Sequence, residues 1–82
     1  MELIDAAQNG DIGHVRELLD LGVDPNIRDN DGLTALILAS SYGHSDIARL
    51  LLDYGADPSI RDNTDGTALI EASGNGHTDI VR

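Results

Sequence analysis

An internal repeat of 33 residues constrains the fold of this 82-residue chain more than any other feature. Residues 29–49 align at this spacing with residues 62–82 without a gap, and thirteen of the twenty-one pairs are identical. Residues 18–28 align in the same way with residues 51–61. A repeat of this length predicts a supersecondary unit that buries its apolar face only when neighbouring units stack on it.

Each unit is expected to contain two short antiparallel helices. Residues 34–40 form an apolar run that Thr34 would cap, and Gly43 suits the left-handed end of that helix. A second helix is predicted over residues 45–54, with Ser45 as its N-cap. The segments between helix pairs are rich in Asp, Asn, Gly and Pro, so they are predicted to form loops.

The motifs that recur at this spacing resemble those of ankyrin-repeat proteins over the whole chain. They are GVDP at 22–25, DGLTAL at 31–36, YGH at 42–44, DIARLLLDYGADP at 46–58 and NGH at 75–77. The resemblance implies an all-α solenoid of stacked antiparallel helix pairs with short finger loops or β-hairpins. It also implies one domain over residues 1–82, divided into repeat one (1–28), repeat two (29–61) and an incomplete repeat three (62–82).

Two departures from the family pattern are visible. The family's TPLH reads TALI at 34–37 and again at 67–70, so a proline and a histidine are missing from the first turn. Asp65 takes the position of Gly32, and the third finger loop is therefore expected to differ in shape from the second.

The two ends of the chain are expected to differ. Repeat one carries the polar residues Asp5, His14 and Glu17 at positions that are apolar in repeat two, as an N-terminal cap requires. Repeat three stops at Arg82, after the first turn of its second helix. We therefore expect either a longer array or another chain that covers this open end.

The composition disfavours several classes of partner and site. Fifteen Asp and Glu residues stand against five Arg and no Lys, and the net charge of −10 disfavours nucleic acid and anionic membrane surfaces. No cysteine is present, which excludes disulfides and thiolate metal sites. Since no apolar run approaches the roughly 20 residues that span a membrane and no secretory signal is visible, an intracellular, cytoplasmic location is expected.

The residue types that could bind a metal or take part in catalysis all have structural interpretations here. The Asp clusters before Gly32 and Gly66 lack the spacing of a calcium-binding EF-hand loop. In the ankyrin family, a histidine at the position of His44 and His77 is structural and forms hydrogen bonds between turns. The Ser and Asp residues occur at caps and turns. No metal, no cofactor and no catalytic residue is therefore expected, and the chain is not expected to be an enzyme.

Asn26 has two interpretations. The favoured one is an asparagine that stabilises a turn. The other comes from the resemblance, because an asparagine in a similar ankyrin context is hydroxylated by a dioxygenase in animal cells.

The resemblance implies a non-catalytic scaffold that binds a protein partner through its finger loops and the concave face of its first helices. The family's contact positions correspond here to Arg28, Asn30, Asp31, Leu33, Ser41, Tyr42, Arg61, Asn63, Thr64 and Asn75, and repeat one adds Gln8 and Asn9. Tyr42 is the strongest candidate, because the other copies carry Asn at this position.

Two alternatives remain open. The arginines Arg28 and Arg61 have a second interpretation, in which they form a ladder of surface ion pairs with Asp29 and Asp62. The alternative function is that of a self-associating or structural repeat fragment, natural or designed, whose open C-terminal face stacks on another chain.

Overall fold

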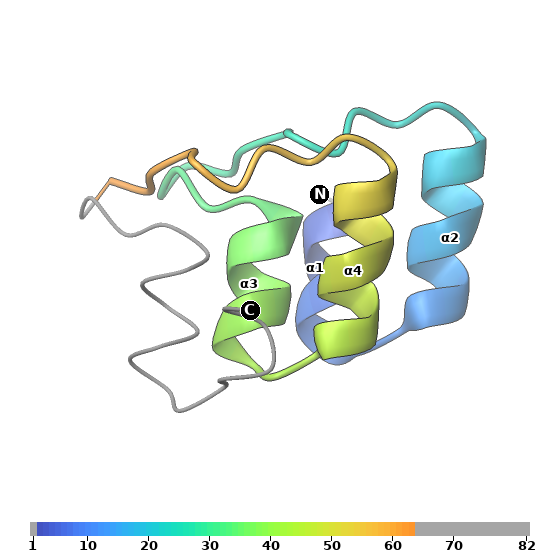
Figure 1. Cartoon of the computed structure of the whole chain (residues 1–82). Helices are drawn as coiled ribbons and strands as arrows, with labels where there is room; N and C mark the ends of the chain where they lie inside the picture. Colours follow the sequence, from blue (N-terminus) through green and yellow to red (C-terminus); the bar gives the residue numbers. More distant parts are fainter. Residues whose placement is uncertain (1, 64–82) are drawn as a thin grey trace.

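The computed structural model describes residues 2–63, and residues 1 and 64–82 lie outside this description. The described residues form four helices: α1 (Glu2–Asn9), α2 (Ile12–Asp20), α3 (Ala35–Ser41) and α4 (Ser45–Asp53). No strand is present among them. Figure 1 shows the four helices side by side, with the tight turns inside each pair at one end and the loops at the other.

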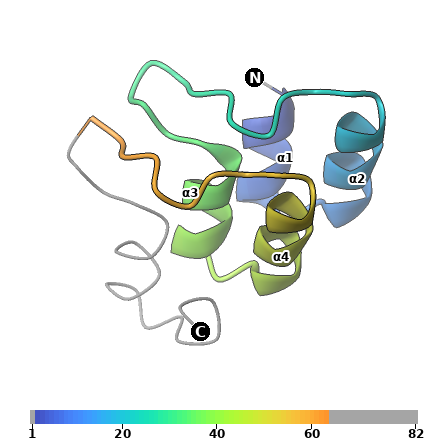
Figure 2. The same ribbon diagram turned by 45° about the horizontal axis from the view of Figure 1, so that its top comes forward.

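The two helix pairs stack with equivalent helices in contact. Helix α1 packs against α3, and α2 packs against α4, while each first helix also packs against the second helix of its own pair. Figure 2 shows this arrangement from the loop side, with α1 and α2 in one layer and α3 and α4 in the next. The structure thus confirms the all-α fold of stacked antiparallel pairs.

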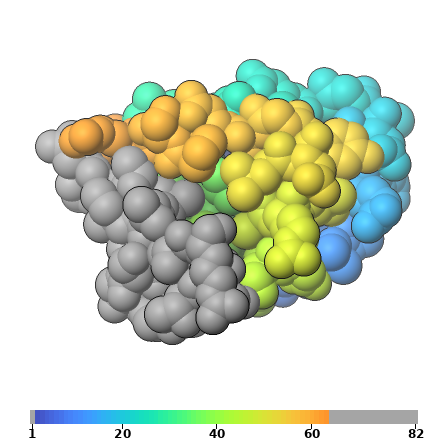
Figure 3. All heavy atoms as spheres, viewed as in Figure 1, coloured from blue at the N-terminus to red at the C-terminus, as the bar shows by residue number. Residues whose placement is uncertain are grey.

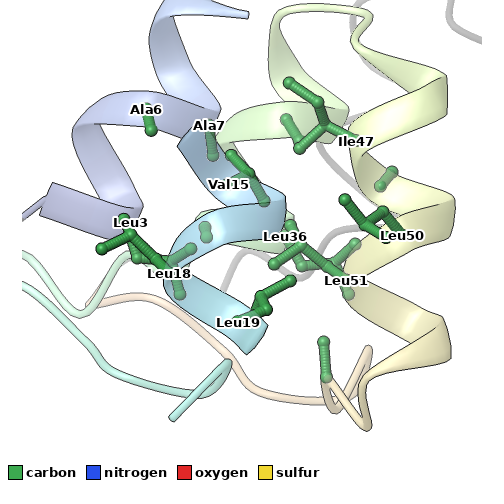
Figure 4. Close-up of a cluster of buried hydrophobic side chains, with 14 of the residues drawn as sticks. Leu3, Ala6, Ala7, Val15, Leu18, Leu19, Leu36, Ile47, Leu50 and Leu51 are labelled. Atoms are coloured by element: carbon green, nitrogen blue, oxygen red, sulfur yellow. The ribbon is translucent and has the colours of Figure 1, made fainter. Parts of the chain in front are cut away.

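The core between the pairs is built from aliphatic side chains of all four helices (Figure 4). Val15 of α2 and Leu51 of α4 are fully buried, and Ala7, Ala35 and Ala39 have no exposed surface. Alanine allows α1 and α3 to approach closely, while burial of each larger side chain contributes about 1.5–3 kcal/mol. Because both pairs supply this core, it is the main source of stability for the stack.

The first helix of the second pair begins and ends as predicted. The Thr34 hydroxyl oxygen accepts a hydrogen bond from the amide of Ile37 at 3.2 Å, which caps α3. Gly43 has a φ of 76°, in the left-handed region that glycine tolerates. Both features depend only on neighbouring residues.

The beginning of α4 differs from the prediction that Ser45 is its N-cap. Ser45 lies inside the helix, and His44 occupies the N-cap position without a side-chain capping bond. The His44 ring is instead turned toward the first helix pair, where its Nε2 donates to the carbonyl of Gln8 at 3.1 Å. A contact between the two pairs has therefore replaced a local cap.

The outer side of the first pair is polar. Asp5 and Glu17 are exposed, and His14 is half-buried, with its Nε2 at 3.2 Å from a carboxylate oxygen of Glu2. The predicted third unit, its altered loop around Asp65 and the end at Arg82 lie outside the described residues.

Candidate protein-binding surface

Two loops run beside each other along one end of the stack: the first loop, residues 21–34, and the second loop, residues 54–63. Figure 3 shows the second loop as a continuous ridge along the top of the molecule, with the first loop behind it. The side-chain amide of Asn63 donates to the carbonyl of Asn30 at 3.0 Å, and its backbone amide donates to the carbonyl of Asp31 at 2.9 Å. Asn63 therefore joins the tips of the two loops, through partners that lie about one repeat length away in the sequence.

Asn26 forms a second connection between the loops. Its Oδ1 accepts from the amide of Asp57 at 2.7 Å, and its Nδ2 donates to the carbonyl of Gly55 at 3.4 Å. Since both polar atoms of the side chain are used, the geometry supports the interpretation of Asn26 as a residue that stabilises the turns.

Arg28 fixes the finger loop, residues 29–33, from its base. Its Nε donates to the carbonyl of Gly32 at 3.3 Å, and its Nη2 donates to the carbonyl of Arg61 at 2.5 Å. Asp29, the proposed ion-pair partner of Arg28, accepts with Oδ1 from the amides of Asp31 and Leu33, both at 2.9 Å. Both side chains thus bind the backbone of the loops.

At the opposite end of the stack, Gln8, Tyr42 and His44 form a group that we call the Tyr42 cluster. The side-chain amide of Gln8 donates to the Tyr42 hydroxyl at 3.1 Å, and the Gln8 carbonyl accepts from His44. The Tyr42 and His44 rings are almost parallel, with an interplanar angle of 13° and centroids 6.3 Å apart. His44 thus forms the bond between turns that the family resemblance implied, and Tyr42 remains 53% exposed.

A further contact between the pairs was not anticipated from the sequence. The Tyr54 hydroxyl donates to the carboxylate of Asp20, and this hydrogen bond is the main reason that the pKa of Tyr54 is raised above its ordinary value of 10.0. The only signal in the sequence is that Tyr54 replaces Leu21 at the same position of the repeat, directly after an aspartate in both copies.

The loop carboxylates with described partners serve turns. Asp24 accepts from the amide of Asn26 at 2.9 Å, and Asp57 accepts from the amide and the hydroxyl of Ser59 at 2.9 and 2.6 Å. These bonds from Ser59 lower the pKa of Asp57. Across residues 2–63 no group of three or more His, Asp or Glu side chains is placed to hold a metal ion. None of the helices in that range is long and apolar enough to cross a bilayer.

The predicted contact residues fall into two groups at opposite ends of α3, a helix about 10 Å long. The loop group contains the exposed residues Arg28, Asn30, Asp31, Arg61 and Asn63, with Leu33 half-buried against the core. The turn group contains half-buried Ser41 and exposed Tyr42. Thr64 and Asn75 lie outside the described residues.

Comparison with known protein families agrees with the repeat structure seen in the stacked helix pairs and the loop contacts. A family model described as "Ankyrin repeats (3 copies)" matches residues 3–82. The chain belongs to the ankyrin-repeat family. Ankyrin repeats are generally non-catalytic modules for protein–protein interaction.

Individual relatives match about half of this ankyrin-repeat chain. It is 48% identical over 44 residues to Ankyrin repeat domain-containing protein 46 of Danio rerio. This alignment covers 54% of this chain and 19% of that protein. Over 46 residues it is 48% identical to the Espin-like protein of Homo sapiens, covering 56% and 5% of the two chains. Serine/threonine-protein kinase 12 of Arabidopsis thaliana is 43% identical over 47 residues, covering 57% and 10%. The chain thus spans less than a fifth of the length of these relatives.

Proposed function

We propose that this chain is a non-catalytic scaffold that binds a protein partner through two contact points, the finger loop and the Tyr42 cluster. The observation that carries the proposal is the state of Tyr42. Its side chain is 53% exposed, and yet its hydroxyl is bound by Gln8 and its ring lies beside His44. An aromatic side chain held in one orientation before binding loses little entropy on contact and is typical of interface hot spots.

The finger loop supplies the second contact point. Asn30 and Asp31 are exposed, while their backbone carbonyls are fixed by bonds from Asn63. The loop therefore presents their side chains in a defined place, as a preorganised binding surface does. A partner that touches both contact points would span the length of α3. Helix α3 is the first helix of its pair, and the ankyrin resemblance implies binding on the concave face that such first helices form.

We propose different roles for the other candidates. Arg28 and Asn63 bind loop backbone, so we assign them to positioning the surface, and we keep Arg61, Leu33 and Ser41 as contacts. Thr64 and Asn75 remain candidates from the sequence. We also keep the division of the chain into repeats at 1–28, 29–61 and 62–82 as part of the proposal.

Site-specific photo-cross-linking tests this proposal. Benzoylphenylalanine placed at position 42 is expected to give a discrete adduct with a cellular protein, and unlabelled wild-type chain should compete it away. The matched control carries the same group at Leu52, an exposed position on the second helix α4. Equal adducts from both positions, or an adduct from position 52 alone, would contradict the proposal.

The captured protein then allows a quantitative test. Tyr42→Asn restores the residue that the other copies carry, Asn9 and Asn75, and so is a mild change for the fold. It is expected to weaken binding by about tenfold or more, as the loss of a hot-spot aromatic does. Leu52→Asn should leave the affinity unchanged, and circular dichroism should show both variants folded.

A further inference from the structure

We infer that the Tyr42 cluster receives a cationic side chain, arginine or lysine, from a basic segment of the partner protein. This inference rests on the proposed function and specifies the chemistry of the partner.

The Tyr42 ring is held from two sides. Gln8 binds its hydroxyl at 3.1 Å, and the His44 ring lies almost parallel to it. His44 is itself fixed, because it bonds to the Gln8 carbonyl and packs so closely on Gly10 that a Cβ there would lie 2.9 Å from its Cε1. The exposed part of the Tyr42 ring is therefore a rigid aromatic surface at the turn end of the stack.

The charges at this end favour a cation. The turn segments 8–15 and 41–48 contain the exposed carboxylates Asp11 and Asp46, and the exposed arginines Arg16 and Arg49 follow these segments within α2 and α4. The whole chain carries a net charge of −10. The face of an aromatic ring also attracts cations, which bind within about 6 Å of its centroid. Ring and carboxylates thus select the same class of side chain, and both disfavour an acidic partner.

An apolar anchor on Tyr42 is less well supported, because no other exposed large hydrophobic side chain of residues 2–63 lies at the turn end. The other exposed large hydrophobic residues among those described are Leu21, Leu52 and Tyr54. They lie at or beside the C-terminal ends of α2 and α4, which is the loop end of the stack. Tyr42 is thus the one exposed large hydrophobic residue at the turn end in the described part of the chain, and a single exposed ring suits a cation better than an aliphatic side chain.

Matched peptides test the inference on the full 82-residue protein. The probe is the acetylated and amidated peptide Gly-Arg-Gly-Arg-Gly, and its control has citrulline, a neutral analogue of the same shape, in place of each arginine. Titration is followed by NMR on the Tyr42 ring signals. The arginine peptide is expected to shift these signals and to bind more weakly as salt is added, whereas the citrulline peptide should not bind measurably.

Variants locate the cation. Tyr42→Asn is expected to lower the affinity for the arginine peptide about two- to fivefold, the range for an exposed cation–π contact. Tyr54→Asn is the matched control, since Tyr54 is also exposed and also lies beside a carboxylate, Asp20. It should leave the affinity unchanged.

Three results would overturn the inference: equal binding of the citrulline peptide, an affinity that Tyr42→Asn leaves unchanged, or an equal loss with Tyr54→Asn. The cross-linking test separates this failure from that of the proposed function. If position 42 cross-links a partner but arginine peptides do not bind there, the chain is a scaffold whose partner is not recognised through a cation.

Discussion

Ser40 is a buried hydroxyl in a core position. It has no exposed surface, and its Oγ has no hydrogen-bond partner within residues 2–63. Ala7 occupies the same position of the first repeat and is equally buried. A buried polar group without a partner destabilises the folded state, because it has given up its bonds to water.

Ser40→Ala is therefore expected to raise the free energy of unfolding by about 1 kcal/mol. Urea unfolding followed by circular dichroism measures this change. The reverse substitution, Ala7→Ser, introduces the same defect into the first repeat and should lower the free energy of unfolding by about 1–2 kcal/mol. A destabilising Ser40→Ala would show that the hydroxyl has a favourable contact.

The bond between Tyr54 and Asp20 predicts a loss of stability at high pH. The bond raises the pKa of Tyr54 in the folded state above its ordinary value of 10.0. Its stabilising effect is thus fully present below the ordinary value and is lost as the pH rises through the folded value. Melting temperatures measured across this window should fall more steeply for the wild type than for Tyr54→Phe. Parallel curves would contradict the prediction.

Single residues were predictable from the sequence where their partners are local. Thr34 and Gly43 act on their own helix, and their roles follow from residue type and position. Arg28 also binds Arg61, and Tyr54 binds Asp20, each about one repeat away. These contacts depend on how closely the pairs stack and on which rotamer each long side chain adopts. The repeat spacing in the sequence shows which turns are neighbours, but it does not show how far apart the side chains of neighbouring repeats lie.

Among the elements, the helices were more predictable than the loops. The two helices of the second pair lie within a residue of their predicted bounds, since apolar spacing and turn residues specify both ends. The finger loop, by contrast, is closed by bonds from the amide of Asp29 to the carbonyl of Leu33 and from the amide of Gly32 to that of Asp29, both at 3.0 Å. For this segment, the family resemblance predicted either a short loop or a β-hairpin and did not distinguish between them.

Gly32 gives a test of the finger loop. Its φ is 76°, and a Cβ on it would lie 2.6 Å from Oδ1 of Asn63 and 2.8 Å from Nη2 of Arg28. Gly22 is a matched control, with a φ of 91° and no atom within 4 Å of its added Cβ. Gly22→Ala should cost about 1–2 kcal/mol from backbone strain alone, and Gly32→Ala should cost clearly more. Urea unfolding of both variants measures the difference, and equal costs would show that the finger loop can move away.

At the scale of the whole molecule, the shared core predicts that both helix pairs unfold together. Leu51 is fully buried within this core. Leu51→Ala is expected to cost about 2–5 kcal/mol, which approaches the whole stability of a small domain. Amide NMR signals from α1 and α4 should then disappear at the same urea concentration. Persistence of the α1 and α2 signals after those of α4 are lost would show that the first pair is stable alone.

The function was predictable to the level of its class, because the repeat motifs identify the ankyrin family, and the family gives protein binding. The candidate surface was predictable only in part. Tyr42 stands out in the sequence as the one aromatic residue at a position where the other copies carry Asn. The support that Gln8 and His44 give to its ring depends on the stacking of two turns, which no local pattern encodes.

The contacts between the loops also constrain how the length of each repeat can change during evolution. Arg28 reaches Arg61, and Asn63 reaches Asn30, because each pair is separated by one repeat length. A single inserted or deleted residue between them would displace all of these contacts at once, whereas replacing an exposed side chain that takes no part in them, such as Leu52, leaves them intact. We therefore expect descendants of this sequence to tolerate substitution at Leu21 or Leu52 far more readily than any change in the number of residues per repeat.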